Sequence, residues 1–160
     1  LHAGYFGAKE VTGVDISGYA CEFATENARL NHVEDRVRFE CANCFDYLRE
    51  AQEAKEQFDV VILDPPAFTK SRKTVKNAEK GYKEINLRAL RLLPRGGYFA
   101  TASCSHFMPS ELFVKMLKSA ALDAGVELRQ IEARQQSPDH PILWNVPETD
   151  YLKFYLFQVV

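Results

Sequence analysis

FDVVILDPPAF, residues 58–68, joins a short and continuous apolar run to an acid and two prolines. A run of this length and content is typical of a buried strand in a parallel sheet. A carboxylate followed by two rigid prolines is poorly suited to simple capping. We therefore expect Asp64 at the carboxyl edge of a sheet, which is where open α/β folds bind their ligands.

A second stretch, GYFATASCSH at residues 97–106, has the same organisation. Its apolar run ends in Ser103-Cys104-Ser105-His106. A third run, VTGVD at residues 11–15, ends in Asp15. Because the carboxyl ends of parallel strands share one edge of a sheet, we expect the acid Asp64 and the thiol Cys104 to face one crevice.

The whole chain alternates strands with helices, which implies right-handed β-α-β units on a mostly parallel sheet. One helix is opened by Ser17, one is stopped by Pro94 and another by Gly125. The pattern predicts strands at 10–15, 37–42, 58–63, 97–103, 126–134 and 151–159, and helices at 18–31, 45–55, about 78–93 and 109–124. The fold class is therefore α/β.

The composition is that of one globular domain: 160 residues, 46% apolar and 26% charged. The apolar runs are too short to span a bilayer and no leader pattern opens the chain, so we expect a cytoplasmic protein without membrane contact. Four reduced cysteines are expected, and neither a redox pair nor a metal site is favoured at Cys41-Ala42-Asn43-Cys44. We expect Cys21, Cys41 and Cys44 to be small core residues.

These motifs together resemble a class I S-adenosylmethionine-dependent methyltransferase. The closest resemblance is to the bacterial 23S ribosomal RNA (cytosine-C5) methyltransferases, whose catalytic domain follows a PUA domain. The matching stretches are residues 7–17, 63–68, 103–105, 139–141 and 147–153. The resemblance implies a Rossmann-like sheet with an antiparallel last strand. It also implies that 1–160 is an incomplete catalytic domain, truncated before Leu1, where a first strand and a glycine-rich turn would stand.

The resemblance implies S-adenosyl-L-methionine as cofactor. Asp15 would accept both ribose hydroxyls; alternatively it only caps the helix that follows. Ile16 would pack beside the adenine. Asn43 stands where the family has an acid, and its amide oxygen can accept the same hydrogen bond from the adenine amino group without charge assistance. The cofactor-binding residues are expected to be Asp15, Ile16, Ser17, Asn43, Cys44, Asp64 and Pro65.

Cys104 and Asp64 are the candidate catalytic residues. Carbon 5 of cytosine is a weak nucleophile, so its methylation requires a temporary bond at carbon 6, which a thiolate supplies. Asp64 would hydrogen-bond the N3/amino edge of the base. His106 can either assist the thiol or brace its loop. The sequence identifies no base for removal of the carbon 5 proton.

RNA contact is suggested by residues 69–83, which hold six basic residues and one acid. Such a patch attracts phosphates, although a solvated surface loop is the alternative. Phe68 is either a base-stacking platform or a hydrophobic plug. His140 would wall the base pocket, and Trp144 is expected to be a loop buttress. The candidate substrate-binding residues are Pro66, Phe68, Lys70, Arg72, Lys73 and His140.

Three functions remain open on the sequence. The first is a ribosomal RNA cytosine-C5 methyltransferase, with 23S RNA as partner and a homodimer as one possible assembly. The second is an enzyme of the same fold that methylates a guanine nitrogen, in which Cys104 is incidental. The third is an RNA-binding or assembly domain without catalysis.

Overall fold

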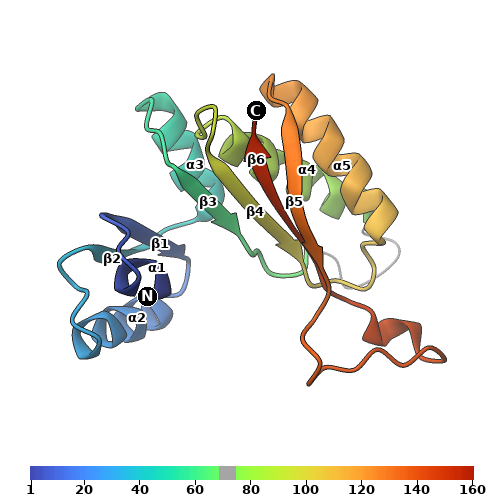
Figure 1. Cartoon of the computed structure of the whole chain (residues 1–160), viewed down its shortest axis with the longest axis horizontal. Helices are drawn as coiled ribbons and strands as arrows, with labels where there is room; N and C mark the ends of the chain where they lie inside the picture. The colour runs from blue at the N-terminus through green and yellow to red at the C-terminus, as the bar shows by residue number, and fades with distance from the viewer. Residues whose placement is uncertain (69–74) are drawn as a thin grey trace. The chain divides into compact units, whose positions relative to one another are not determined.

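The computed structural model describes residues 1–68 and 75–160, without the side chain of Lys76. The described chain divides into two compact units, Leu1–Glu50 and Ala51–Val160. Figure 1 labels their helices and strands. Each unit is described by itself below.

The first unit is built around a pair of parallel strands. β1 (Val11–Asp15) pairs with β2 (Val37–Cys41), and α2 (Gly18–Leu30) connects them. The short α1 (His2–Tyr5) precedes β1. A side chain at Gly13 would have its Cβ 2.6 Å from the ring of Phe39, so any larger residue would force Phe39 to move. The small core of this unit consists of Ala28, Val33 and Val37, with Val11 and Phe39 packed against it.

The second unit holds a four-stranded sheet in the order β3-β4-β6-β5. β3 (Val60–Leu63) and β4 (Tyr98–Ser103) are parallel. β6 (Lys153–Val159) runs antiparallel to both β4 and β5 (Leu128–Arg134). The Rossmann-like fold with an antiparallel last strand is therefore confirmed. α3 (Cys44–Glu53) crosses the boundary between the two units.

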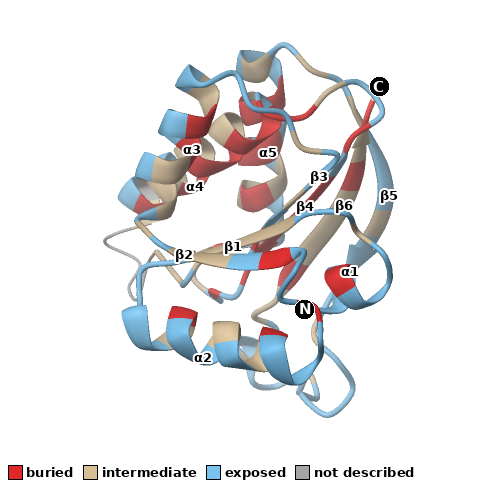
Figure 2. Ribbon diagram, turned by 90° about the vertical axis from the view of Figure 1, so that its left-hand side faces the viewer, coloured by how far each residue is buried: buried red, intermediate tan, exposed pale blue. Residues whose placement is uncertain are grey.

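The core of the second unit lies between the sheet and the helix pair α4 (Val75–Leu90) and α5 (Ser110–Ala124). These helices lie side by side on one face of the sheet, and Figure 2 shows their buried turns in red. Asn86 connects α4 to β4: it accepts a 2.7 Å hydrogen bond from the hydroxyl of Thr101. Gly125 ends α5 with φ +71°, a conformation that favours glycine. The largest buried side chains here include Tyr82, Ile85, Phe99, Phe113 and Met116.

β3 is less buried than its apolar sequence predicts. Val60 and Ile62 are 53% and 68% exposed, whereas Leu63 is buried. The expectation of a buried strand holds for Leu63 and not for Val60 and Ile62, because β3 is at the edge of its unit's sheet and α4 and α5 cover one face only. The helix expected over 78–93 lies three residues earlier, at Val75–Leu90. Leu92 and Leu93 continue the apolar pattern but are buried in the turn that follows.

Candidate active site at the ends of β3 and β4

The two strand-end motifs of the second unit lie at one edge of its sheet. Leu63 pairs with Thr101 in the parallel register of β3 and β4, so Asp64 and Cys104 follow neighbouring strands. Both residues are exposed. Asp64 and Cys104 are therefore placed at the same edge of the sheet, and both are exposed to solvent.

Tyr82 of α4 connects the two motifs. Its hydroxyl oxygen accepts a 3.0 Å hydrogen bond from Ser103, and its ring centroid lies 4.6 Å from that of Phe68. Burial raises the pKa of Tyr82, and the charges of Cys104 and Asp64 act in the same direction. The buried hydroxyl of Tyr82 thus lies within electrostatic range of both candidate catalytic groups. Tyr82 could not be singled out from the sequence, in which it is one aromatic residue within a helix.

Cys104 lies between two buried serines. Ser103 and Ser105 are almost fully buried, and Cys104 between them is exposed. Lys153 at the start of β6 secures the next turn: its Nζ donates hydrogen bonds to the carbonyl oxygens of Ser105 at 2.6 Å and Tyr151 at 2.8 Å. The loop is therefore fixed on both sides of the thiol.

Lys153 is an unusual charge, because its residue is only 5% exposed. Burial lowers the pKa of Lys153 to about 8, and the charges of Asp150 and Cys104 partly oppose that shift. The unusual position of Lys153 could have been recognised in the sequence, but it was missed. Lys153 lies on the same face of β6 as the buried Phe157 and Val159, where an apolar residue is the ordinary choice.

Phe68 packs against α4. It is half-buried, and its ring contacts Tyr82 and lies close to Gly81 on α4. Of the two prolines before it, Pro65 is half-buried and Pro66 is exposed. Packing against α4 accounts for the position of Phe68 without any ligand.

The end of β1 in the first unit presents Asp15, Ile16 and Ser17. Asp15 is exposed, and its Oδ1 accepts a 2.8 Å hydrogen bond from the backbone N–H of Ser17. Ser17 in turn caps α2, since its hydroxyl accepts from Ala20 N–H at 3.3 Å. Ile16 is 73% exposed. One carboxylate oxygen of Asp15 therefore supports the turn, as the capping alternative expects, while an apolar side chain beside it faces solvent.

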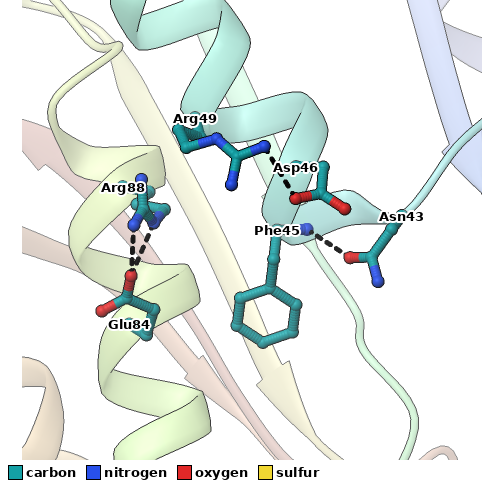
Figure 3. Close-up of polar contacts among 6 residues, drawn as sticks. All are labelled: Asn43, Phe45, Asp46, Arg49, Glu84 and Arg88. Atoms are coloured by element: carbon teal, nitrogen blue, oxygen red, sulfur yellow. Dashed lines mark hydrogen bonds and ion pairs between the residues drawn. The ribbon is translucent and has the colours of Figure 1, made fainter.

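Asn43 caps α3 at the end of β2. Its Oδ1 accepts a 2.9 Å hydrogen bond from Phe45 N–H, and Asp46 and Arg49 form an ion pair one turn further along (Figure 3). An amide oxygen has two lone pairs, so one acceptor position remains beyond this bond. Cys44 is half-buried, and burial raises the pKa of its thiol.

The prediction that three cysteines are core residues holds for one of them. Cys21 is buried, Cys44 is intermediate, and Cys41 is exposed. Cys41 is exposed because β2 ends there, at the point where the chain turns toward α3. In the part of the chain that the structure describes, no group of three or more metal-ligating side chains is present.

The loop before β6 holds His140 and Trp144. His140 is exposed, and its Nδ1 lies 2.9 Å from the hydroxyl of Tyr151. The expectation that Trp144 buttresses the loop was wrong, because Trp144 is 99% exposed. Thr149 secures the loop instead: its hydroxyl accepts from Leu143 N–H at 2.8 Å and donates to the carbonyl oxygen of Val146 at 2.7 Å.

Only part of the basic segment 69–83 lies within the described residues. Lys70, Arg72 and Lys73 lie outside the described residues. Lys80 is exposed, whereas Lys83 forms a 2.6 Å ion pair with Asp123 and so contributes less free charge than its sequence position predicts. Among the described residues, no helix has the length and apolarity of a membrane span.

Comparison with known sequences identifies a family. A family model described as a methyltransferase domain matches residues 3–146. The ribosomal RNA large subunit methyltransferase I of Tolumonas auensis is 47% identical over 148 residues, covering 92% of this chain and 37% of that protein. The enzyme of the same name from Pseudoalteromonas atlantica is 41% identical over 155 residues, covering 96% and 39%. The chain thus spans about two fifths of the length of these relatives.

Solved structures share the fold. The crystal structure of SMU.776 complexed with SAH has a TM-score of 0.82 and 20% identity, and covers 96% of this chain and 40% of that one. TrmN from Thermus thermophilus has a TM-score of 0.64 and 22% identity, with coverage of 99% and 39%. At these identities the comparison concerns the architecture alone.

Proposed function

The chain belongs to the methyltransferase domain family, and from this premise we propose that it is the catalytic part of an S-adenosylmethionine-dependent enzyme that methylates carbon 5 of a cytosine in 23S ribosomal RNA. The observation that carries the proposal is the exposed thiol of Cys104, which lies between two fixed serines directly after β4, the strand that pairs with the one before Asp64. The likeness to ribosomal RNA large subunit methyltransferases I supports the substrate class.

The chemistry assigns one role to each catalytic residue. The thiolate of Cys104 adds to carbon 6; the electron pair of the C5–C6 double bond then forms a C4–C5 double bond, and the pair of the C4–N3 double bond moves onto N3, which leaves an enamine that is nucleophilic at carbon 5. Asp64 hydrogen-bonds the N3/amino edge and favours that redistribution. Bound S-adenosylmethionine would supply the methyl group to carbon 5 and would leave as S-adenosylhomocysteine. Loss of the carbon 5 proton then restores the double bond as Cys104 leaves, and no residue is assigned to accept that proton.

The cofactor would be held by the ends of the strands. Asp15 keeps a second carboxylate oxygen beyond the one that accepts from Ser17, and this oxygen is a suitable acceptor for ribose hydroxyls. The exposed side chain of Ile16 offers an apolar surface for the adenine. Asn43 would accept from the adenine amino group with its remaining lone pair. The other members of the proposed cofactor site are Ser17, Cys44, Asp64 and Pro65.

The RNA would be bound by surfaces of two kinds. Lys70, Arg72 and Lys73 supply charge for phosphates. The fully exposed Trp144 offers a face on which an unstacked base can lie, and His140 lies in the same loop. The target base must leave its stack to reach Cys104. The proposal also includes three further expectations: an upstream strand with a glycine-rich turn, a PUA domain and a cytoplasmic location.

A second candidate is methylation of a guanine nitrogen. It is favoured by Asp64-Pro65-Pro66, because methyltransferases that act on exocyclic amino groups use a similar acid, proline and aromatic sequence. The test is nucleoside mass spectrometry of 23S RNA after incubation with the full-length protein and methyl-labelled S-adenosylmethionine. We expect label in 5-methylcytidine. Label in a methylguanosine would favour the second candidate, and a lack of label together with tight RNA binding would favour a non-catalytic domain.

A further inference from the structure

We propose that Lys153 is a positioning residue for Cys104: it fixes the backbone that follows the thiol and holds a positive charge within electrostatic range of it. The inference rests on the proposed function in one respect, namely that Cys104 is the nucleophile. The contacts of Lys153 themselves are independent of any substrate.

The geometry ties Lys153 to the Cys104 loop. Lys153 pairs with Ser103 in the antiparallel register of β4 and β6, so its backbone lies beside the residue that precedes the thiol. Its Nζ reaches past Cys104 and donates to the carbonyl oxygen of Ser105 at 2.6 Å. A second bond to the carbonyl of Tyr151, at 2.8 Å, anchors the ammonium on its own strand. The side chain therefore connects β6 to the segment that carries Cys104.

Burial of this ammonium calls for an explanation beyond packing. An apolar side chain would fill a strand face at lower cost, because a buried charge loses its hydration. The two carbonyl oxygens compensate only in part, since the pKa of Lys153 still falls to about 8. A charge retained at such a site is expected to act on a neighbouring group.

Cys104 is such a neighbour. The Cys104 thiolate and the Asp150 carboxylate both favour the charged form of Lys153. An ammonium in this place would attract a negative charge that forms on the Cys104 sulfur. A second cationic side chain, Arg134 on the adjacent strand β5, also lies near Lys153: both line a cavity of about 270 Å³ together with Tyr155. The Arg134 guanidinium forms an ion pair with Glu132 at 2.6 Å.

The two roles proposed for Lys153 differ in whether they need its positive charge. Here a structural peg is a side chain that only fixes the backbone, and an electrostatic partner is one that acts on Cys104 through its charge. A peg needs only a donor for the carbonyl oxygen of Ser105, and a neutral amide supplies one. An electrostatic partner needs the charge itself. Replacement of Lys153 by glutamine, by methionine and by arginine separates these requirements.

The first experiment measures alkylation of Cys104 by iodoacetamide in the full-length protein from pH 6 to pH 9, followed by peptide mass spectrometry. At pH 7 we expect Lys153→Gln and Lys153→Met to slow Cys104 about threefold to tenfold, because the thiolate is the reactive form. Lys153→Arg should stay within about twofold of the wild type, since it retains the charge. The exposed Cys41 serves as an internal standard, and Lys118→Met on the exposed side of α5 is the matched control. Equal Cys104 profiles in all variants would overturn the proposal.

The second experiment holds even if the neutral variants do not fold. Lys153 is titrated by NMR of ¹³Cε-labelled lysine, with Lys153→Arg used to assign its signal. In Cys104→Ala we expect the Lys153 midpoint to fall from its wild-type position, because a negative partner is lost; Cys41→Ala should leave it in place. Cys104 is exposed, so its truncation should not disturb the core. An unchanged midpoint refutes the coupling, whereas a lack of methyl transfer with the coupling intact would count against the proposed function alone.

Discussion

The hydroxyl of Ser103 donates a 3.0 Å hydrogen bond to the hydroxyl oxygen of Tyr82. Both groups are fully buried, and the bond joins α4 to the residue directly before Cys104. Because the ring of Tyr82 also packs on Phe68, the same side chain supports the segment that follows Asp64. The two candidate catalytic loops therefore share one buried support.

We predict that Tyr82→Phe destabilises the protein by about 1–2 kcal/mol, because Ser103 loses its buried partner. Methyl transfer should fall more than cofactor affinity does. Urea unfolding and single-turnover rates test this prediction. Tyr98→Phe, at a partly exposed position of β4, is the control, and equal unfolding free energies for both variants would contradict the role of the bond.

Asp15→Ala should weaken S-adenosylmethionine binding by about 2–4 kcal/mol, since two charge-assisted hydrogen bonds to ribose are lost. RNA affinity should remain the same, because the carboxylate would contact ribose and not phosphate. Isothermal titration of the full-length protein measures both affinities. Asp35→Ala removes another exposed carboxylate of the same unit and should have no effect on the cofactor. If Asp15→Ala binds the cofactor as the wild type does, Asp15 only supports its turn.

Cys104→Ala should abolish a denaturation-resistant adduct with RNA that carries 5-fluorocytosine at the target position. Fluorine cannot leave as a proton, so the bond between the thiol and carbon 6 is trapped after methyl transfer. Gel electrophoresis under denaturing conditions detects the adduct. Cys21→Ala, Cys41→Ala and Cys44→Ala should retain it. Methylation that persists in Cys104→Ala would move guanine-nitrogen methylation to first place.

Combined replacement of Lys70, Arg72 and Lys73 by alanine should weaken RNA binding and make it less dependent on salt. Each phosphate contact that is lost lowers the slope of log affinity against log salt by about 0.7–0.9. Filter binding at several salt concentrations measures the slope. Lys118→Ala is the single-charge control on α5. A slope that does not change would mean that the segment is a solvated surface.

The stability of the protein relative to Lys153→Met should rise with pH between about 8 and 10. The pKa of Lys153 is lowered from 10.5 to about 8 by burial, so in this range the unfolded chain binds more protons than the folded one. Stability therefore increases as pH rises, by about 2 kcal/mol across the window. Urea unfolding at each pH gives the difference, and Lys118→Met corrects for general effects. A difference that is constant with pH would contradict the burial of a charged lysine.

The sequence predicted the elements because apolar runs and helix stops are local features. The ends of β3 and β4 were also predictable, since Asp64 and Cys104 directly follow their strands. Burial of individual side chains was harder to predict. Val60 and Ile62 are apolar, like the residues of a buried strand. Their exposure nevertheless depends on which faces of the sheet the helices cover.

Tyr82 and Lys153 were missed for a related reason. Each acts across elements that are distant in the chain: Tyr82 contacts Ser103 from α4, and Lys153 reaches Ser105 from β6. The apolar face of β6 marks Lys153 as unusual, but no local pattern encodes the contact that either residue makes. Trp144 shows the opposite error, because a large aromatic residue in a loop is ordinarily packed and this one is not.

Ser103 and Ser105 are buried and Cys104 between them is exposed. This alternation of burial restricts which insertions and deletions the gene segment can accept. Successive residues of an extended chain face opposite sides, so loss or gain of one codon between Gly97 and Cys104 would turn the sulfur inward and leave a hydroxyl outside. A hydroxyl is a far weaker nucleophile than a thiolate at neutral pH. Point substitutions within β4 can therefore accumulate, while the length of this strand should be constant among active descendants.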